Sequence, residues 1–142
     1  MNLKAILDSI PYIVHHDIEI LETSENEVRL LIPFRQEVRN YVGTMHAGAL
    51  FTAAETAAGA VAFMVVPGGQ TFALLRGVDI KYTRRAESDV VAVARIKPED
   101  AVSARTSVEK TGRGDVIVSL ILTDKEDAVV FQGNFDYALR SR

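Results

Sequence analysis

Residues 40–66 read NYVGTMHAGALFTAAETAAGAVAFMVV, and we expect the rest of the chain to be organised around them. Between Arg39 and Arg76 the only formally charged residue is Glu55, which is surrounded by alanine, threonine and glycine. A helix that starts near Ala47 would be apolar on almost every side, as is typical of a helix in a protein core. The sequence therefore predicts a buried central helix that carries one carboxylate.

One face of this helix is made of small or polar residues. Positions three, four and seven apart share a helix face, and the face with the carboxylate carries Gly48, Phe51, Thr52, Glu55, Gly59 and Ala62. Apart from the phenylalanine, these side chains let another group approach the backbone closely. A buried carboxylate without a partner is a candidate general acid, base or nucleophile. The alternative is a structural role, in which Glu55 pairs with an arginine or meets water at a subunit interface.

The residues that lead into the helix are polar and punctuated by glycine: Asn40, Gly43, Thr44, His46 and Gly48. The first N–H groups of a helix lack intrahelical acceptors and lie at the positive end of its dipole. Such a position is suited to holding a developing oxyanion. The segment thus supplies a proton acceptor, an oxyanion site and a polar orienting group, which are the parts that acyl transfer needs.

The run Gly43-Thr44-Met45-His46-Ala47-Gly48, followed by Ala54-Glu55-Thr56, resembles the His-Gly-Gly-x-x-x-x-Leu-Ala-Glu/Asp motif of hotdog-fold acyl-CoA thioesterases. These enzymes form the 4-hydroxybenzoyl-CoA thioesterase superfamily. The carboxylate lies nine residues after the histidine, as in the family, and Asn40 lies six before it, where several members carry an asparagine. The resemblance implies an α+β hotdog fold, in which a curved antiparallel sheet wraps around one long helix.

The resemblance also implies the roles of the site residues. Glu55 would activate water or attack the thioester, the Ala47 N–H would bind the thioester oxygen, and His46 with Asn40 would orient substrate or water. Ala53 stands where the motif has leucine, and Ala47 stands where the family usually has glycine, which adds a methyl group beside the N–H donor. The candidate catalytic residues are Asn40, His46, Ala47, Gly48 and Glu55, and Thr52 and Gly59 are candidates for contact with the substrate.

Lys81, Arg84 and Arg85 cluster near the end of an expected strand. Guanidinium groups bind phosphate well, and coenzyme A carries phosphates, so Arg84 and Arg85 are candidate substrate-binding residues. The alternative is a solvated strand end. Coenzyme A would be part of the substrate, and the chemistry needs no metal and no other cofactor.

Composition limits the remaining possibilities. A chain of 142 residues with 48% hydrophobic content is expected to form one domain, residues 1–142. A net charge of −3 gives no broad attraction to nucleic acid or to an anionic membrane, and neither is expected as a partner. There is no cysteine for a disulfide or a thiolate nucleophile. The first residues, MNLKAILDSIPYIV, lack the features of a secretory signal, so we expect a cytoplasmic protein.

Other segments have the patterns of short elements. Apolar residues at helical spacing predict a lid-like helix over residues 3–10, ended by Pro11. A hairpin is expected from 17–22 and 28–32, and His15 and His16, as adjacent strand residues, would form a surface pair rather than a metal site. Residues 67–69 break the chain, and we expect only strands beyond them: 72–85, 88–96, a strand with Val102, Ala104, Thr106 and Val108 on one face, 116–123 and 129–137. Turns are expected at 97–100 and 112–115.

Connections this short favour antiparallel neighbours. Such a sheet has free edges, and the face around Glu55 is too apolar to stay in water, so we expect a homodimer or a dimer of dimers. In the resembled family the active site lies at that dimer interface. Two alternatives to a thioesterase stay open: a non-catalytic acyl-CoA or fatty-acyl binding domain, and a hydratase or dehydratase on the same fold.

Overall fold

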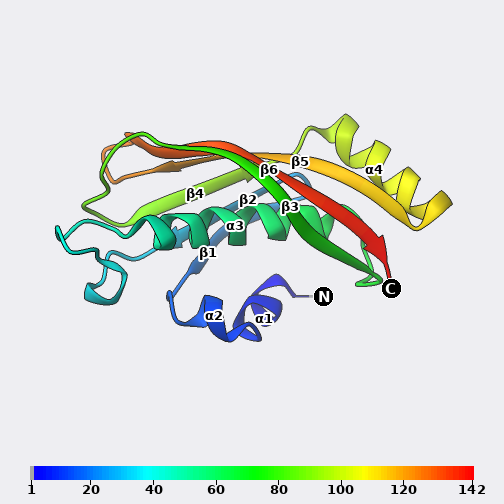
Figure 1. Cartoon of the computed structure of the whole chain (residues 1–142). Helices are drawn as coiled ribbons and strands as arrows, with labels where there is room; N and C mark the ends of the chain where they lie inside the picture. The colour runs from blue at the N-terminus through cyan, green and yellow to red at the C-terminus, as the bar shows by residue number, and fades with distance from the viewer. Residues whose placement is uncertain (1) are drawn as a thin grey trace.

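The central helix is present in the computed structural model, which describes residues 2–142. Helix α3 spans Ala47–Met64 and runs through the middle of the molecule (Figure 1). It is long and apolar enough to cross a membrane by length and composition, but 61% of its residues are buried inside the protein. Burial on this scale within the chain's own structure is what a core helix shows.

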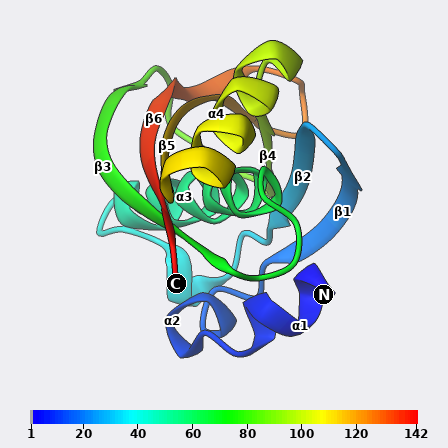
Figure 2. The same cartoon turned by 90° about the vertical axis from the view of Figure 1, so that its right-hand side faces the viewer.

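A six-stranded sheet curves around α3, and each neighbouring pair of strands is antiparallel (Figures 1 and 2). The spatial order is β1-β2-β4-β5-β6-β3. The strands are β1 Glu19–Ser24, β2 Glu27–Ile32, β3 Thr71–Tyr82, β4 Val90–Arg95, β5 Arg113–Thr123 and β6 Val129–Ser141. The predicted α+β class, the antiparallel sheet around one long helix and the first hairpin are therefore confirmed.

The sheet presents its apolar face to α3. In β5, every second residue from Gly114 to Leu122 is buried and the residues between them are exposed. This alternation places Val116, Val118 and Leu120 against the helix, because successive side chains of a strand point to opposite faces. β3 differs, since it forms one edge of the sheet and most of its residues are exposed, including Leu74 at 55% and Tyr82 at 47%.

The strand expected around residues 102–108 is wrong. Residues Pro98–Thr111 form helix α4, which covers the end of the sheet where α3 ends (Figure 2). Its buried residues, Ala101, Ala104 and Val108, are three and four positions apart, whereas Val102 is 57% exposed.

The expected turns on either side of this segment are the two ends of α4. Pro98 occupies the first helical turn together with two acidic residues, and Gly112 ends the helix with a φ of 74°. β5 then begins at Arg113, so residues 112–115 are a junction between helix and strand and not a hairpin turn.

The N-terminal segment forms two short helices, α1 Leu3–Asp8 and α2 Pro11–Val14, where one was expected. Pro11 begins α2 because its fixed φ and missing N–H suit the first turn of a helix. His15 and His16 follow α2 and are not strand residues, and His16 is buried with its Nδ1 atom 2.8 Å from the Tyr12 carbonyl oxygen. Both helices lie on the side of α3 that the sheet leaves open (Figures 1 and 2).

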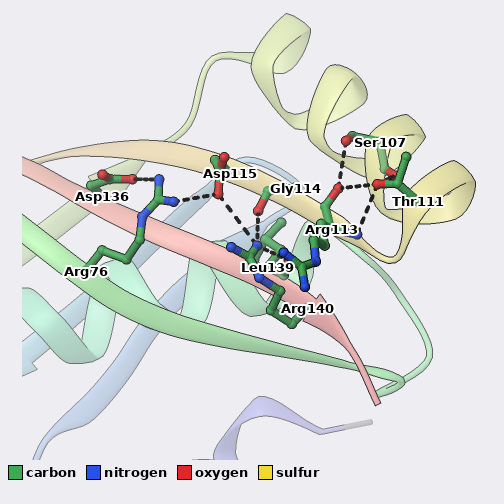
Figure 3. A network of polar contacts seen from close by, with 9 residues as sticks. All are labelled: Arg76, Ser107, Thr111, Arg113, Gly114, Asp115, Asp136, Leu139 and Arg140. Carbon is green, nitrogen blue, oxygen red and sulfur yellow. Dashed lines mark hydrogen bonds and ion pairs between the residues drawn. The ribbon is translucent and has the colours of Figure 1, made fainter.

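A polar network joins β3, β5 and β6 on the surface of the sheet (Figure 3). The Arg76 guanidinium lies 3.0 Å from Asp115 and 2.9 Å from Asp136, and Arg140 Nη1 donates to the Gly114 carbonyl oxygen at 3.1 Å. These side chains are partly exposed, so water screens the ion pairs. The network links the three strands, and its ion pairs contribute little to the free energy of unfolding.

Candidate active site

The loop before α3 is built on the side chain of Asn40. Its Oδ1 atom accepts hydrogen bonds from the N–H groups of Val42 (3.1 Å) and Thr44 (3.0 Å). Its Nδ2 atom donates to Thr44 Oγ1 at 2.9 Å, and Gly43 between them has a φ of 82°. The Asn40 amide is therefore engaged within its own loop, and it shapes the approach to α3.

His46 caps the N-terminus of α3. Its Nδ1 atom accepts a hydrogen bond from the Gly48 N–H at 2.8 Å, so that N–H is already used. Within residues 2–142, the Ala47 N–H donates to no acceptor, and Ala47 is exposed. Of the first two N–H groups of the helix, the one free to bind an oxyanion is therefore that of Ala47, at the positive end of the helix dipole.

Glu55 is half-buried in the middle of α3, and its carboxylate is held by Tyr137 of β6. The Tyr137 hydroxyl lies 3.0 Å from Glu55 Oε1 and 3.2 Å from the Glu55 carbonyl oxygen. Burial, together with the negative charge of Glu55, raises the pKa of the Tyr137 phenol well above its ordinary value. The phenol therefore stays protonated at neutral pH and acts as a hydrogen-bond donor to the carboxylate.

The alternative in which Glu55 pairs with an arginine is absent from the described part of the chain. The ion pairs found there use other carboxylates, and the Glu55 side chain contacts no guanidinium. Within residues 2–142, the Glu55 carboxylate therefore has a neutral hydrogen-bond donor and no cationic partner.

An apolar cavity of about 190 Å³ lies beside Glu55, between α3 and the two N-terminal helices. Glu55 is the one ionisable group in its wall, and the other lining residues are Leu3, Ile6, Leu7, Ile10, Ile13, Thr56, Gly59, Ala60, Phe63 and Ala73. Gly59 keeps the space next to the carboxylate open, because a Cβ atom there would lie 3.4 Å from both Glu55 Oε1 and the Tyr137 hydroxyl.

A second hollow, of about 330 Å³, lies at the N-terminal end of α3. Asn40, Ala47, Arg84 and Arg85 are among the residues that line it, together with Tyr82. The Tyr82 hydroxyl donates to the Ala47 carbonyl oxygen at 3.0 Å, which anchors β3 to the start of the helix. Both arginines are exposed and form no ion pair within residues 2–142.

The candidate residues fall into two groups within one chain. Asn40, Ala47 and the two arginines gather at the N-terminal hollow, whereas Glu55 and Gly59 line the apolar cavity. Thr52 lies between them, and its hydroxyl donates to the Gly48 carbonyl oxygen at 2.8 Å. At 1.5 Å per residue, the positions of Ala47 and Glu55 are about 12 Å apart along the helix. The carboxylate also lies beside Gly59, on the side away from Ala47.

Tyr137 is the residue that the sequence-based prediction missed. It is 1% exposed and lies on the inner face of β6, where its neighbours Phe135 and Leu139 are also buried. A tyrosine hydroxyl on such a face needs a buried hydrogen-bond partner. The sequence offered Glu55 as one possible partner for such a hydroxyl, but no local pattern specifies which tyrosine lies over it.

Comparisons with known proteins place the chain among thioesterase-like structures. A family model described as "Domain of unknown function (DUF4442)" matches residues 2–139. One similar solved structure is that of PA5026 from Pseudomonas aeruginosa, a protein of unknown function described as a probable thioesterase. Its sequence is 26% identical to this chain, and the two structures superpose with a TM-score of 0.86 over 99% of this chain and 94% of PA5026. No curated protein matches the sequence.

Two further solved structures show the likeness in fold. The thioesterase HI1161 from Haemophilus influenzae is 15% identical with a TM-score of 0.80, over 99% of this chain and 92% of its own. The thioesterase SAV0944 from Staphylococcus aureus is 14% identical with a TM-score of 0.78, over 92% and 99%.

Proposed function

We propose that this chain, which belongs to the DUF4442 family of domains of unknown function, is an acyl-CoA thioesterase with a hotdog fold of the 4-hydroxybenzoyl-CoA thioesterase superfamily. One observation carries the proposal: the Glu55 carboxylate is unneutralised, held by Tyr137, and exposed to an apolar cavity. The thioesterases among the similar structures support thioester hydrolysis in general. The proposal places the reaction in the cytoplasm and requires no metal or redox cofactor.

Glu55 acts as the general base or as the nucleophile. As a base it takes a proton from water, whose oxygen forms a bond to the thioester carbonyl carbon. The negative charge that develops on the carbonyl oxygen is bound by an Ala47 N–H. The carbon–sulfur bond then breaks, and Glu55 returns the proton to the leaving thiolate, so the products are a carboxylic acid and free coenzyme A.

Two copies of the chain are needed for this site. The Ala47 N–H and the Glu55 carboxylate of one chain lie too far apart to contact the same carbonyl group, because reacting atoms must come within about 3.5 Å. The exposed edge strand β3 carries apolar side chains, including Phe72 and Leu74, and offers a surface for a second copy. The protein therefore works as a homodimer or as a dimer of dimers, in which Glu55 of one copy meets Ala47 of the other.

The remaining candidates have supporting roles. Arg84 and Arg85 bind the phosphates of coenzyme A at the hollow that also contains Ala47. His46 and Asn40 keep the start of α3 in position. His46 accepts a hydrogen bond from the Gly48 N–H, and Asn40 accepts one from the Thr44 N–H in the preceding loop. Gly59 and Thr52 lie on the substrate side of the helix, and Gly59 leaves room beside the carboxylate.

The test is the release of free thiol from a panel of acyl-CoA thioesters. Glu55→Gln keeps the size of the side chain and removes its basicity, so kcat should fall by about 10² or more if Glu55 is a general base. Glu99→Gln, an exposed change on α4, is the matched control and should leave the rate unchanged. Equal rates for the wild type and Glu55→Gln would remove Glu55 from the mechanism.

A second candidate function is binding of acyl-CoA without turnover. The observation that favours it is the methyl group of Ala47 beside the free N–H donor, where a thioester oxygen would have to approach. In that case the purified protein would bind acyl-CoA, and no member of the panel would release thiol.

A further inference from the structure

We infer that the cavity between α3 and the two N-terminal helices holds the hydrocarbon tail of the acyl group, and that the substrates are medium-chain acyl thioesters. This inference rests on the proposed function, because it takes the reacting carbonyl group to lie at Glu55. It adds a binding site, formed by α1 and α2, and a length for the acyl chain.

The cover of the cavity is aliphatic and incompletely packed. Leu3, Ile6, Leu7, Ile10 and Ile13 all face the cavity, but among the residues of α1 and α2 only Leu7 is buried. Ile10 remains 38% exposed. Aliphatic side chains around an unfilled space forgo the contacts that make burial favourable, and a hydrocarbon chain would supply those contacts.

The walls make the cavity selective for hydrocarbon. Apart from Glu55 and Thr56, each lining residue is aliphatic, aromatic or glycine, so most of the wall offers a polar group on the acyl tail no replacement for its hydration. Among the α3 residues that line the cavity, Glu55 lies nearest the N-terminus of the helix, and Gly59, Ala60 and Phe63 follow toward its C-terminus. A carbonyl group at Glu55 therefore directs its tail along the helix toward Phe63 and away from Ala47.

The volume sets the length of the tail. A cavity of about 150 Å³ lined by Leu, Ile and Phe stays dry and binds benzene, which has six carbons. The present cavity, at about 190 Å³, accommodates by proportion roughly six to eight carbons beyond the carbonyl group. Longer tails would have to leave the cavity past α1 or α2 and would gain less from each added methylene.

The test measures binding of S-alkyl-CoA thioethers, which lack the carbonyl group and cannot be hydrolysed, with chains from butyl to dodecyl. Each methylene that enters the cavity should lower Kd about fourfold, and the gain should level off once the cavity is full, at roughly seven to nine alkyl carbons. A Kd that does not depend on chain length, or one that keeps falling about fourfold per methylene up to dodecyl, would overturn the inference.

Two variants and a control locate the tail. Ala73→Leu adds three carbons to the cavity wall, so Kd should level off at an alkyl chain about three carbons shorter than in the wild type. Ile6→Ala enlarges the cavity, so Kd should level off at a longer alkyl chain. Ala5→Leu makes the same change as Ala73→Leu on the exposed side of α1 and should match the wild type. If Ala73→Leu and Ile6→Ala both bind like Ala5→Leu, the tail lies elsewhere and the inference is wrong.

The inference and the proposed function fail in different ways. Thiol release that is equally fast for short and long acyl-CoAs, in the wild type and in Ala73→Leu, would refute the tail site while the thioesterase proposal stands. The expected dependence of Kd on chain length, with no thiol release from any acyl-CoA, would keep the tail site and refute the hydrolase.

Discussion

Replacing Tyr137 with phenylalanine removes the one hydroxyl group that holds the Glu55 carboxylate and leaves the aromatic ring in place. A hydrogen bond to a charged group contributes about 1.5–3 kcal/mol to stability. Because Glu55 is half-buried, water can replace part of the lost bond, and the cavity left by a single oxygen atom is small. We therefore expect the free energy of unfolding to fall by about 1–2 kcal/mol.

The assay is chemical denaturation at one fixed protein concentration, since the stability of an oligomer depends on concentration. Tyr82→Phe is the matched control: its hydroxyl also donates one hydrogen bond, but the residue is 47% exposed and its acceptor is a neutral carbonyl. Removal of this hydrogen bond should lower the free energy of unfolding by about 0.5 kcal/mol, near the lower end of the range for neutral hydrogen bonds. Equal losses for the two variants would refute the special role of the buried contact.

The same variant tests how Glu55 is positioned. A carboxylate that has lost its donor can adopt other rotamers, and misplacement of a reacting group by about 1 Å can cost up to 10² in rate. We expect Tyr137→Phe to lower kcat for thiol release by tenfold or more with little change in KM. An unchanged kcat would show that the hydroxyl does not orient the carboxylate for the reaction.

Further predictions concern pH, packing and the loop before α3. Burial raises the pKa of the Tyr137 phenol, so below about pH 10 the phenol is protonated in both the folded and the unfolded chain and stability does not depend on its titration. Above about pH 10 the phenol of the unfolded chain loses its proton first, which favours unfolding. Denaturation should therefore show that the wild type loses up to about 1.4 kcal/mol of its free energy of unfolding per pH unit more than Tyr137→Phe does. Gly114→Ala places a Cβ atom 2.8 Å from the Ala104 carbonyl oxygen and should lower the free energy of unfolding by about 1–3 kcal/mol, measured by denaturation; an unchanged value would mean that α4 moves freely away from β5. Asn40→Ala removes the hydrogen bonds of its loop and should slow thiol release more than Asn26→Ala, a change in the turn between β1 and β2; equal rates would separate the loop from catalysis.

The central helix and its carboxylate could be predicted from the sequence because both depend on local composition. A long apolar segment with a single charge is expected to form a helix in the protein core, and the polar residues before Ala47 indicate where this helix begins. Short connections correctly indicated the antiparallel pairs β1–β2 and β5–β6, whereas the other three pairs join strands that are distant in sequence or separated by α4. The helix, its carboxylate and these two hairpins are set by residues close together in the chain.

The α4 segment was misread because its side chains fit two periods. Val102, Ala104, Thr106 and Val108 alternate as a strand would, but the buried set contains Ala101 and omits Val102. The boundary residues carried the better signal. Proline at the start of a segment and glycine after its end are the preferred limits of a helix, and they outweigh a weak alternation.

The contact between Glu55 and Tyr137 was out of reach for a different reason. The two residues are 82 positions apart and meet only because β6 pairs beside β5 and β3 in a sheet that curves over α3. Local patterns do not determine which strand of a sheet lies over a given helix turn. The position of α1 and α2 beneath α3 depends in the same way on the complete fold.

The order of the strands also has a consequence during translation. β3 pairs with β6, which the ribosome adds about fifty residues later, so at 5–20 residues per second β3 waits roughly three to ten seconds for its neighbour. Throughout that interval the inner edge of β3 and its apolar side chains, such as Phe72 and Leu74, are open to other nascent chains. Chains that stall or end before β6 should therefore aggregate, and holdase chaperones should engage the growing polypeptide between these two strands.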